Sequence, residues 1–180
     1  MSLQEGGIQK GESAAKKRYD NHSLLAQMQR LCAIREYTIQ DINSKLRNKG
    51  CSEHEILEIV GKLIEDNYIN EERYAFAFVR DKSTLAGWGR KKIEYALKNK
   101  GIGQTVIKIA LDSISSESDI ALLEKLLLKK INELKPKLES KDDGTKKLRE
   151  KLLRFALSRG FSYEDILKVI NKTLANLEPE

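Results

Sequence analysis

Three glycines mark a weak internal repeat in this chain of 180 residues. Gly50, Gly101 and Gly160 each follow one short helical pattern and precede another, at similar intervals along the chain. An isoleucine stands six places after every glycine, at Ile56, Ile107 and Ile166. A helical unit repeated in this way buries its apolar face against its neighbours, which produces an extended molecule. Extended helical stacks typically act as binding surfaces, so the repeat favours a binding function over catalysis.

The helical periodicity predicts an all-α fold, made of three tandem three-helix repeats that form an elongated, curved molecule. The expected repeats are residues 21–69, 70–116 and 117–178. Residues 1–20 mix Gly, Lys, Ser and Glu with little periodicity, so we expect a flexible basic arm there. No segment alternates with a period of two for long enough to indicate a strand.

Capping and stop signals mark the helix boundaries. Ser52 with Glu55 forms a capping box, and a glycine supplies the left-handed stop before it. A serine-rich joint at 113–118 is expected to separate the second repeat from the third. Pro136 is expected to end or kink a helix, and residues 141–144 read as a polar loop.

Composition narrows the class of protein further. Charged residues make up 33% of the chain and aromatic residues only 6%, which predicts aliphatic cores and a large solvated surface. The net charge of +6 suits a polyanionic partner or an acidic protein surface. Alternatively, the lysines only keep the helices soluble and bind no partner. Cys32 and Cys51 form no CxxC pattern. With no apolar run of membrane-spanning length and no visible signal peptide, a reducing cytoplasm is the expected compartment.

Six residues of the middle repeat are the candidate contacts to a protein or nucleic-acid partner. They are Arg73, Arg80, Trp88, Arg90, Lys91 and Lys92. The last three are consecutive cations at the start of a helix, where positive charge opposes the macrodipole. Because this position is locally unfavourable, it indicates a role in binding. Together with exposed backbone N–H groups they could bind phosphate or carboxylate.

Each of these residues also has a structural interpretation. Trp88 lies between two glycines, and it either stacks on a base or a partner, or fills the gap between two repeats. Arg73 and Arg80 are either contact residues or solvated cations of an amphipathic helix.

The sequence offers little chemistry for catalysis, metals or cofactors. The Walker pattern GxxxxGK[ST] is absent, and the glycines at 87 and 89 have no preceding strand that would make them a dinucleotide motif. His22 and His54 lack plausible metal partners. We therefore expect no enzymatic activity, no metal and no cofactor.

Three segments of the chain resemble the RecX family of regulatory proteins. They run from Leu63 to Ala75 (LIEDNYINEERYA), from Gly87 to Ile93 (GWGRKKI) and from Leu97 to Ile102 (LKNKGI). In that family a motif like "L…gYlnDerfA", a "G-x-G…I" turn and "L…kGi" occur in this order. Glu72 stands where the family often has Asp, which is a conservative departure.

The resemblance implies a bacterial modulator of RecA. Such proteins are three-helix repeats that lodge in the groove of the RecA–DNA filament and inhibit its recombinase and ATPase activities, and they can also bind DNA. We expect an elongated monomer with the RecA filament as its partner. A sequence-independent DNA-binding module without a protein target is the alternative, and an enzyme is the least favoured class.

Overall fold

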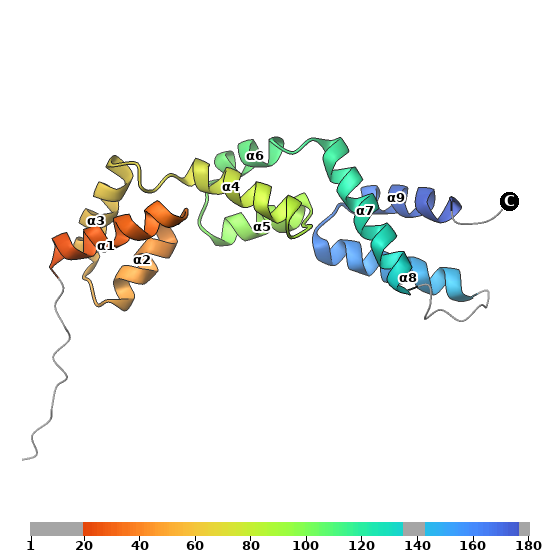
Figure 1. Cartoon of the computed structure of the whole chain (residues 1–180), viewed down its shortest axis with the longest axis horizontal. Coiled ribbons are helices and arrows are strands. Elements are labelled where there is room, and N and C mark those ends of the chain that lie inside the picture. The colour runs from red at the N-terminus through yellow and green to blue at the C-terminus, as the bar shows by residue number, and fades with distance from the viewer. Residues whose placement is uncertain (1–19, 135–142, 177–180) are drawn as a thin grey trace, which may run out of the picture.

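The computed structural model describes residues 20–134 and 143–176. These residues form helices and connecting turns, with no strand among them. The helices are α1 (Asn21–Ile34), α2 (Ile39–Asn48), α3 (Glu53–Glu65), α4 (Glu71–Thr84), α5 (Arg90–Asn99), α6 (Gln104–Asp112), α7 (Ser116–Leu134), α8 (Asp143–Arg159) and α9 (Tyr163–Ala175). Figure 1 shows them as three groups in an elongated row. The expected all-α fold is confirmed.

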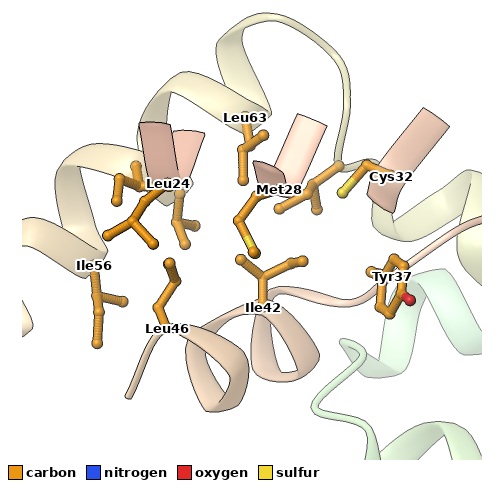
Figure 2. Packing of buried hydrophobic residues seen from close by; sticks show 11 residues of the cluster. Leu24, Met28, Cys32, Tyr37, Ile42, Leu46, Ile56 and Leu63 are labelled. Atoms are coloured by element: carbon orange, nitrogen blue, oxygen red, sulfur yellow. The ribbon is translucent and has the colours of Figure 1, made fainter. Parts of the chain in front are cut away.

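Each group of three consecutive helices has its own hydrophobic core. One cluster of buried side chains belongs to α1–α3, a second to α4–α6 and a third to α7–α9. Figure 2 shows the first, in which Leu24 and Met28 of α1 face Ile42 and Leu46 of α2. Because no core spans two groups, the groups are held to one another by local contacts at their joints.

The three glycines that define the repeat end equivalent helices. Gly50, Gly101 and Gly160 have φ angles of 84°, 79° and 86°, so they adopt the left-handed conformation after α2, α5 and α8. In each case the next residue's N–H donates to a carbonyl five residues back, as in a Schellman motif. The isoleucines six places later are buried in the three cores: Ile56, Ile107 and Ile166.

Two helices begin earlier than the sequence suggests. Helix α8 starts at Asp143, so residues 143 and 144 of the expected polar loop are helical. The N–H of Ser118 donates to the Ser115 hydroxyl at 3.1 Å, so the serine-rich segment caps and starts α7 at Ser116 instead of forming a joint as far as residue 118. Residues 1–19 of the basic arm expected at 1–20, and the expected helix end at Pro136, lie outside the described residues. The boundaries proposed for the three repeats stay a prediction.

The second and third groups meet where the end of α8 touches the start of α5. The N–H of Gly89 donates to the carbonyl of Arg159 at 2.8 Å, and the N–H of Lys91 donates to the carbonyl of Gly160 at 3.1 Å. These N–H groups have no partner within α5, and the carbonyls end α8, so each helix satisfies the other. The backbones are so close that a Cβ on Gly160 would lie 2.5 Å from the nitrogen of Lys92. We call this contact the backbone joint.

The first and second groups meet through side chains. Arg73 of α4 places its Nε 2.5 Å from the carboxylate of Glu36, and Lys100 after α5 places its Nζ 2.8 Å from Asp41 of α2. The Gln40 amide, oriented to satisfy its neighbours, donates to the carbonyl of Lys100 at 3.1 Å. We call this set the side-chain joint. It brings the end of α5 to the start of α2, as the backbone joint brings the end of α8 to the start of α5.

Replacing glycine by alanine should have opposite effects at two positions. Gly160→Ala is expected to lower the free energy of unfolding by at least about 2 kcal/mol, because of its positive φ and its contact with Lys92. Gly61→Ala should raise it by about 1 kcal/mol, because that site is helical and no heavy atom lies within 4 Å of the added Cβ. Urea denaturation at pH 7 measures both.

Gly101→Ala is the intermediate case for this comparison. Its φ of 79° is strained for alanine, but the Gln40 side chain lies 3.7 Å from the added Cβ, which is an ordinary contact. A loss at Gly160 no larger than at Gly101 would contradict a close backbone approach at the backbone joint.

Acid should weaken the side-chain joint at Asp41. Burial raises the pKa of this carboxyl, but hydrogen bonds from Lys100 and Thr38 outweigh burial and hold the pKa below its usual 3.8. The unfolded chain therefore binds the proton more readily, so the stabilisation is complete above about pH 4 and disappears as the pH falls through the folded pKa. Asp41→Asn should cost about 1 kcal/mol at pH 7 and progressively less below pH 4.

Urea denaturation between pH 3 and 7 tests this pH dependence. Asp81→Asn, on the exposed side of α4, serves as the control and should change stability at pH 7 by less than about 0.5 kcal/mol. A cost of Asp41→Asn that is equal at pH 3 and pH 7 would show that the carboxylate charge contributes nothing.

Candidate functional site

The six candidate residues do not form one open site. They lie on α4, on the turn between α4 and α5, and on the first turn of α5. Two of the arginines hold the molecule together, while the other residues gather around Trp88 or stand in solvent. Their roles therefore differ according to the contacts that their side chains make.

Arg73 and Arg90 are engaged within the chain. Besides its pair with Glu36, Arg73 donates to the backbone carbonyl of Asn67 at 3.1 Å. Arg90 donates through Nε to Asp119 of α7 at 3.0 Å and through Nη2 to the carbonyl of Ile114. These contacts fix the start of α5 to the connection between α6 and α7. They account for both guanidinium groups without a partner molecule.

The carboxyl of Asp119 depends on Arg90. Burial raises its pKa, and the charge and hydrogen bond of the Arg90 guanidinium act against this rise. The other carboxyl oxygen, Oδ1, is buried and has no hydrogen-bond partner among the described residues. Removing Arg90 would therefore leave a largely buried acid with no compensation.

Trp88 is partly buried and is flanked by two cations. Its ring packs edge-on against Phe78, with centroids 6.4 Å apart, and Phe78 in turn stacks on Tyr74. The ammonium groups of Lys82 and Lys92 lie 5.0 and 4.7 Å from the indole centroid. Trp88 thus packs on the second group's core and supports two lysines, whose charges it holds at the surface.

The start of α5 is not an open anion site. The N–H groups of Gly89 and Lys91, which the sequence suggested as phosphate ligands, donate to carbonyls of the third group. The Lys92 ammonium donates to the carbonyl of Ser158 at 3.1 Å, so its charge sits at the end of α8, where it is favourable. The neighbouring helix therefore accounts for the position of Lys92 on α5. The side chain of Lys91 is exposed.

Arg80 stands apart from the other candidates. Its side chain is exposed, and its Nε lies 3.2 Å from the carboxylate of Asp81. It borders an open hollow between the end of α4 and the start of α7, which Ser83, Ile114 and Leu122 also line. This position leaves the guanidinium accessible from solvent.

Helix α8 supplies cations that the sequence analysis overlooked. Lys151, Arg154 and Ser158 share one face of α8, because they are spaced at three and four residues. The backbone carbonyl of Ser158 accepts from the Lys92 ammonium, so this face of α8 ends at the backbone joint. We call Lys82, Lys91, Lys92, Lys151 and Arg154 the basic track. The signal was available as the dense run of Lys and Arg between residues 146 and 154.

Charge is distributed unevenly along the row of helices. Residues 20–69 carry six Lys or Arg against eight Asp or Glu, whereas residues 70–115 carry nine against five. The described part of the third group, 116–134 and 143–176, carries eleven against eight. The basic track therefore lies in the positive two thirds of the molecule, and the first group is slightly acidic.

Within the described ranges, no group of three or more His, Cys, Asp or Glu side chains is placed to hold a metal ion. None of the described helices is long and apolar enough to cross a membrane.

Comparison with known proteins gives the family. The model of the second three-helix domain of RecX matches residues 70–111, and that of its third three-helix domain matches residues 117–170. A regulatory protein RecX from Caldanaerobacter subterraneus subsp. tengcongensis is 30% identical over 145 residues, which cover 80% of this chain and 67% of that protein. The chain belongs to the RecX family.

Other RecX proteins agree with this assignment. The regulatory protein RecX of Clostridium perfringens strain SM101 is 35% identical over 139 residues. The match covers 77% of this chain but only 63% of that relative's length. The crystal structure of RecX from Lactobacillus salivarius superposes with a TM-score of 0.70 at 26% identity, covering 84% of this chain and 95% of that one. The resemblance seen in the sequence motifs is thus confirmed.

Two neighbouring cations of this RecX family member should differ sharply in their effect on stability. Arg90→Ala is expected to lower the free energy of unfolding by roughly 1–3 kcal/mol, because Asp119 and the carbonyl of Ile114 lose their donor. Lys91→Ala should stay within about 0.5 kcal/mol, because its side chain is exposed. Urea denaturation of the two variants checks this, and equal effects would contradict a structural role for Arg90.

Proposed function

We propose that this chain is a non-enzymatic regulator that binds the RecA–DNA filament and inhibits its recombinase and ATPase activities. Its membership of the RecX family supports this role, since the relatives are named regulatory proteins. The proposal places the chain in the cytoplasm, acting as an elongated monomer in DNA recombination and repair. RecA on DNA is its partner, and no cofactor takes part.

The basic track is the observation that carries the proposal. Its cations on α5 and α8 lie on either side of the backbone joint, whose hydrogen bonds fix the two helices relative to one another. A rigid row of cations at the surface attracts phosphate groups and acidic side chains, which are abundant on a protein–DNA filament. The elongated shape lets both groups that carry the track contact the filament at once.

Of the six candidate residues, we propose Arg80, Lys91 and Lys92 as contacts to the filament. Arg80 and Lys91 are exposed, and Lys92 is held at the surface beside Trp88. We propose that Trp88 holds Lys82 and Lys92 at the surface. We propose Arg73 and Arg90 as residues that position the three groups of helices.

Direct binding to DNA without RecA is the second candidate function. The number of cations in the track favours it, because each neutralised phosphate releases counterions. Binding to duplex DNA should then weaken with salt, with log K falling by about 0.9 per phosphate for every tenfold rise in salt concentration. Binding that needs RecA at every salt concentration would exclude this candidate.

Charge reversal in the basic track should weaken inhibition without unfolding the chain. The variant Lys91→Glu/Lys151→Glu/Arg154→Glu alters three exposed side chains and leaves Arg90 in place. We expect at least a tenfold higher concentration of this variant to be needed for half-maximal inhibition of DNA-dependent ATP hydrolysis by RecA. Cosedimentation with RecA filaments should fall in parallel.

A control variant carries the same change in net charge away from the track. Arg30→Glu/Lys62→Glu/Lys108→Glu alters exposed cations on α1, α3 and α6. It should inhibit nearly as well as the parent chain. Equal losses in both variants would show that net charge matters and the track does not, and a parent chain that neither inhibits nor cosediments would refute the proposed function.

A further inference from the structure

Helix α3 exposes apolar side chains that no described part of the chain covers. Leu57 is 73% exposed and Ile64 is 46% exposed, although both lie on a helix whose opposite side fills the core of the first group. Gly61 lies between them, one turn from each. Two exposed apolar side chains therefore flank a glycine on one stripe of the helix. We call these three residues the α3 stripe.

The glycine of the stripe packs against nothing in the described part of the chain. A helical glycine is less stable than alanine by about 1 kcal/mol, and it is usually kept where another backbone comes close. No heavy atom lies within 4 Å of a Cβ built on Gly61, and its φ is not positive. Gly89 and Gly160 of the backbone joint differ in this respect, because both are closely packed. The space above Gly61 is open to a helix that crosses α3.

Acidic side chains run along one edge of the stripe. Glu58 and Glu65 lie beside Gly61 on the solvent side of α3, and both are exposed, with the exposed Lys62 between them. The Asn21 amide donates to Glu58 at 3.4 Å. Asp66 directly follows Glu65 and is within 3.4 Å of the Gln29 amide of α1. This edge is negative in a chain whose net charge is +6. The surface is thus apolar in the middle and acidic at one side, which is complementary to a helix with an apolar stripe and a basic edge.

We propose that the α3 stripe is a docking surface for an amphipathic helix of another protein, with Lys or Arg along one edge. The partner helix crosses α3 at Gly61, where the missing side chain allows a close approach of the two axes. Leu57 and Ile64 pack on its apolar side, and Glu58 and Glu65 pair with its cations. This surface is separate from the basic track, so the chain can hold this partner with its first group while the other two groups engage a polyanion.

A synthetic peptide tests the surface independently of RecA and DNA. The peptide is an 18-residue amphipathic helix of Leu and Lys, labelled for fluorescence anisotropy, and its counterpart carries Glu in place of every Lys. The full chain should bind the Lys peptide and should not bind the Glu peptide. The amides of α3 should become protected from hydrogen exchange, and affinity should fall as salt rises because Glu58 and Glu65 are exposed.

Substitutions that keep α3 helical locate the binding. Gly61→Gln fills the open space, Leu57→Gln removes one apolar contact, and each should weaken binding at least tenfold. Leu85→Gln is the matched control, because Leu85 is 84% exposed on the turn after α4 and lies outside the stripe. It should bind as the parent chain does, and circular dichroism should show equal helix content in all three variants.

Several results would overturn the proposal. The Lys peptide failing to bind, binding all variants equally, or protecting helices other than α3 would each do so. Self-association in sedimentation velocity that Leu57→Gln abolishes would assign the stripe to a second copy of this chain. Peptide binding that appears only after residues 1–19 are deleted would assign it to the chain's own N-terminal segment.

Discussion

The end-to-end contact of α8 with α5 is the constraint on which the arrangement of the second and third groups depends. Terminal N–H and carbonyl groups that each helix would leave unsatisfied meet at Gly89 and Gly160, and no other residue type fits so close an approach. The same contact explains the lysines at the start of α5. They stand at the carbonyl end of α8 as well, where positive charge is favourable. Positive charge that is unfavourable for α5 alone is therefore tolerated once α8 of the third group is in contact with it.

The periodic part of this fold was readable from the sequence because it is local. Gly101 ends a helix through hydrogen bonds to residues a few positions away, and Ile107 is buried by the helical spacing that follows. The joints were not readable, because Arg90 meets Asp119 across 29 positions and Lys92 meets Ser158 across 66. For the same reason, the cations at the start of α5 were predicted to form a ligand site. No residue close to them in the sequence shows that the N–H groups at this helix start already donate to carbonyls of α8.

The candidate site changed in composition more than in place. Arg73 and Arg90 hold the groups of helices together through their guanidinium groups, and the proposed surface instead includes Lys151 and Arg154 of α8. The proposed contact surface therefore spans two groups and depends on the joint between them. The surface proposed for this RecX family member therefore needs its contacts at fixed separations. Cations scattered on independent helices would not provide this.

The two joints also differ in what they are made of. One uses backbone atoms in contact, and the other uses ion pairs between partly exposed side chains such as Asp41 and Lys100. Backbone contacts resist any change of angle, whereas long side chains can follow a moving partner and keep their pairing. We therefore expect the contact between the second and third groups, α4 to α9, to resist bending more than the contact between the first and second groups. A change of angle at the side-chain joint would turn the first group and leave the geometry of the basic track, which lies on the other two groups, unaltered.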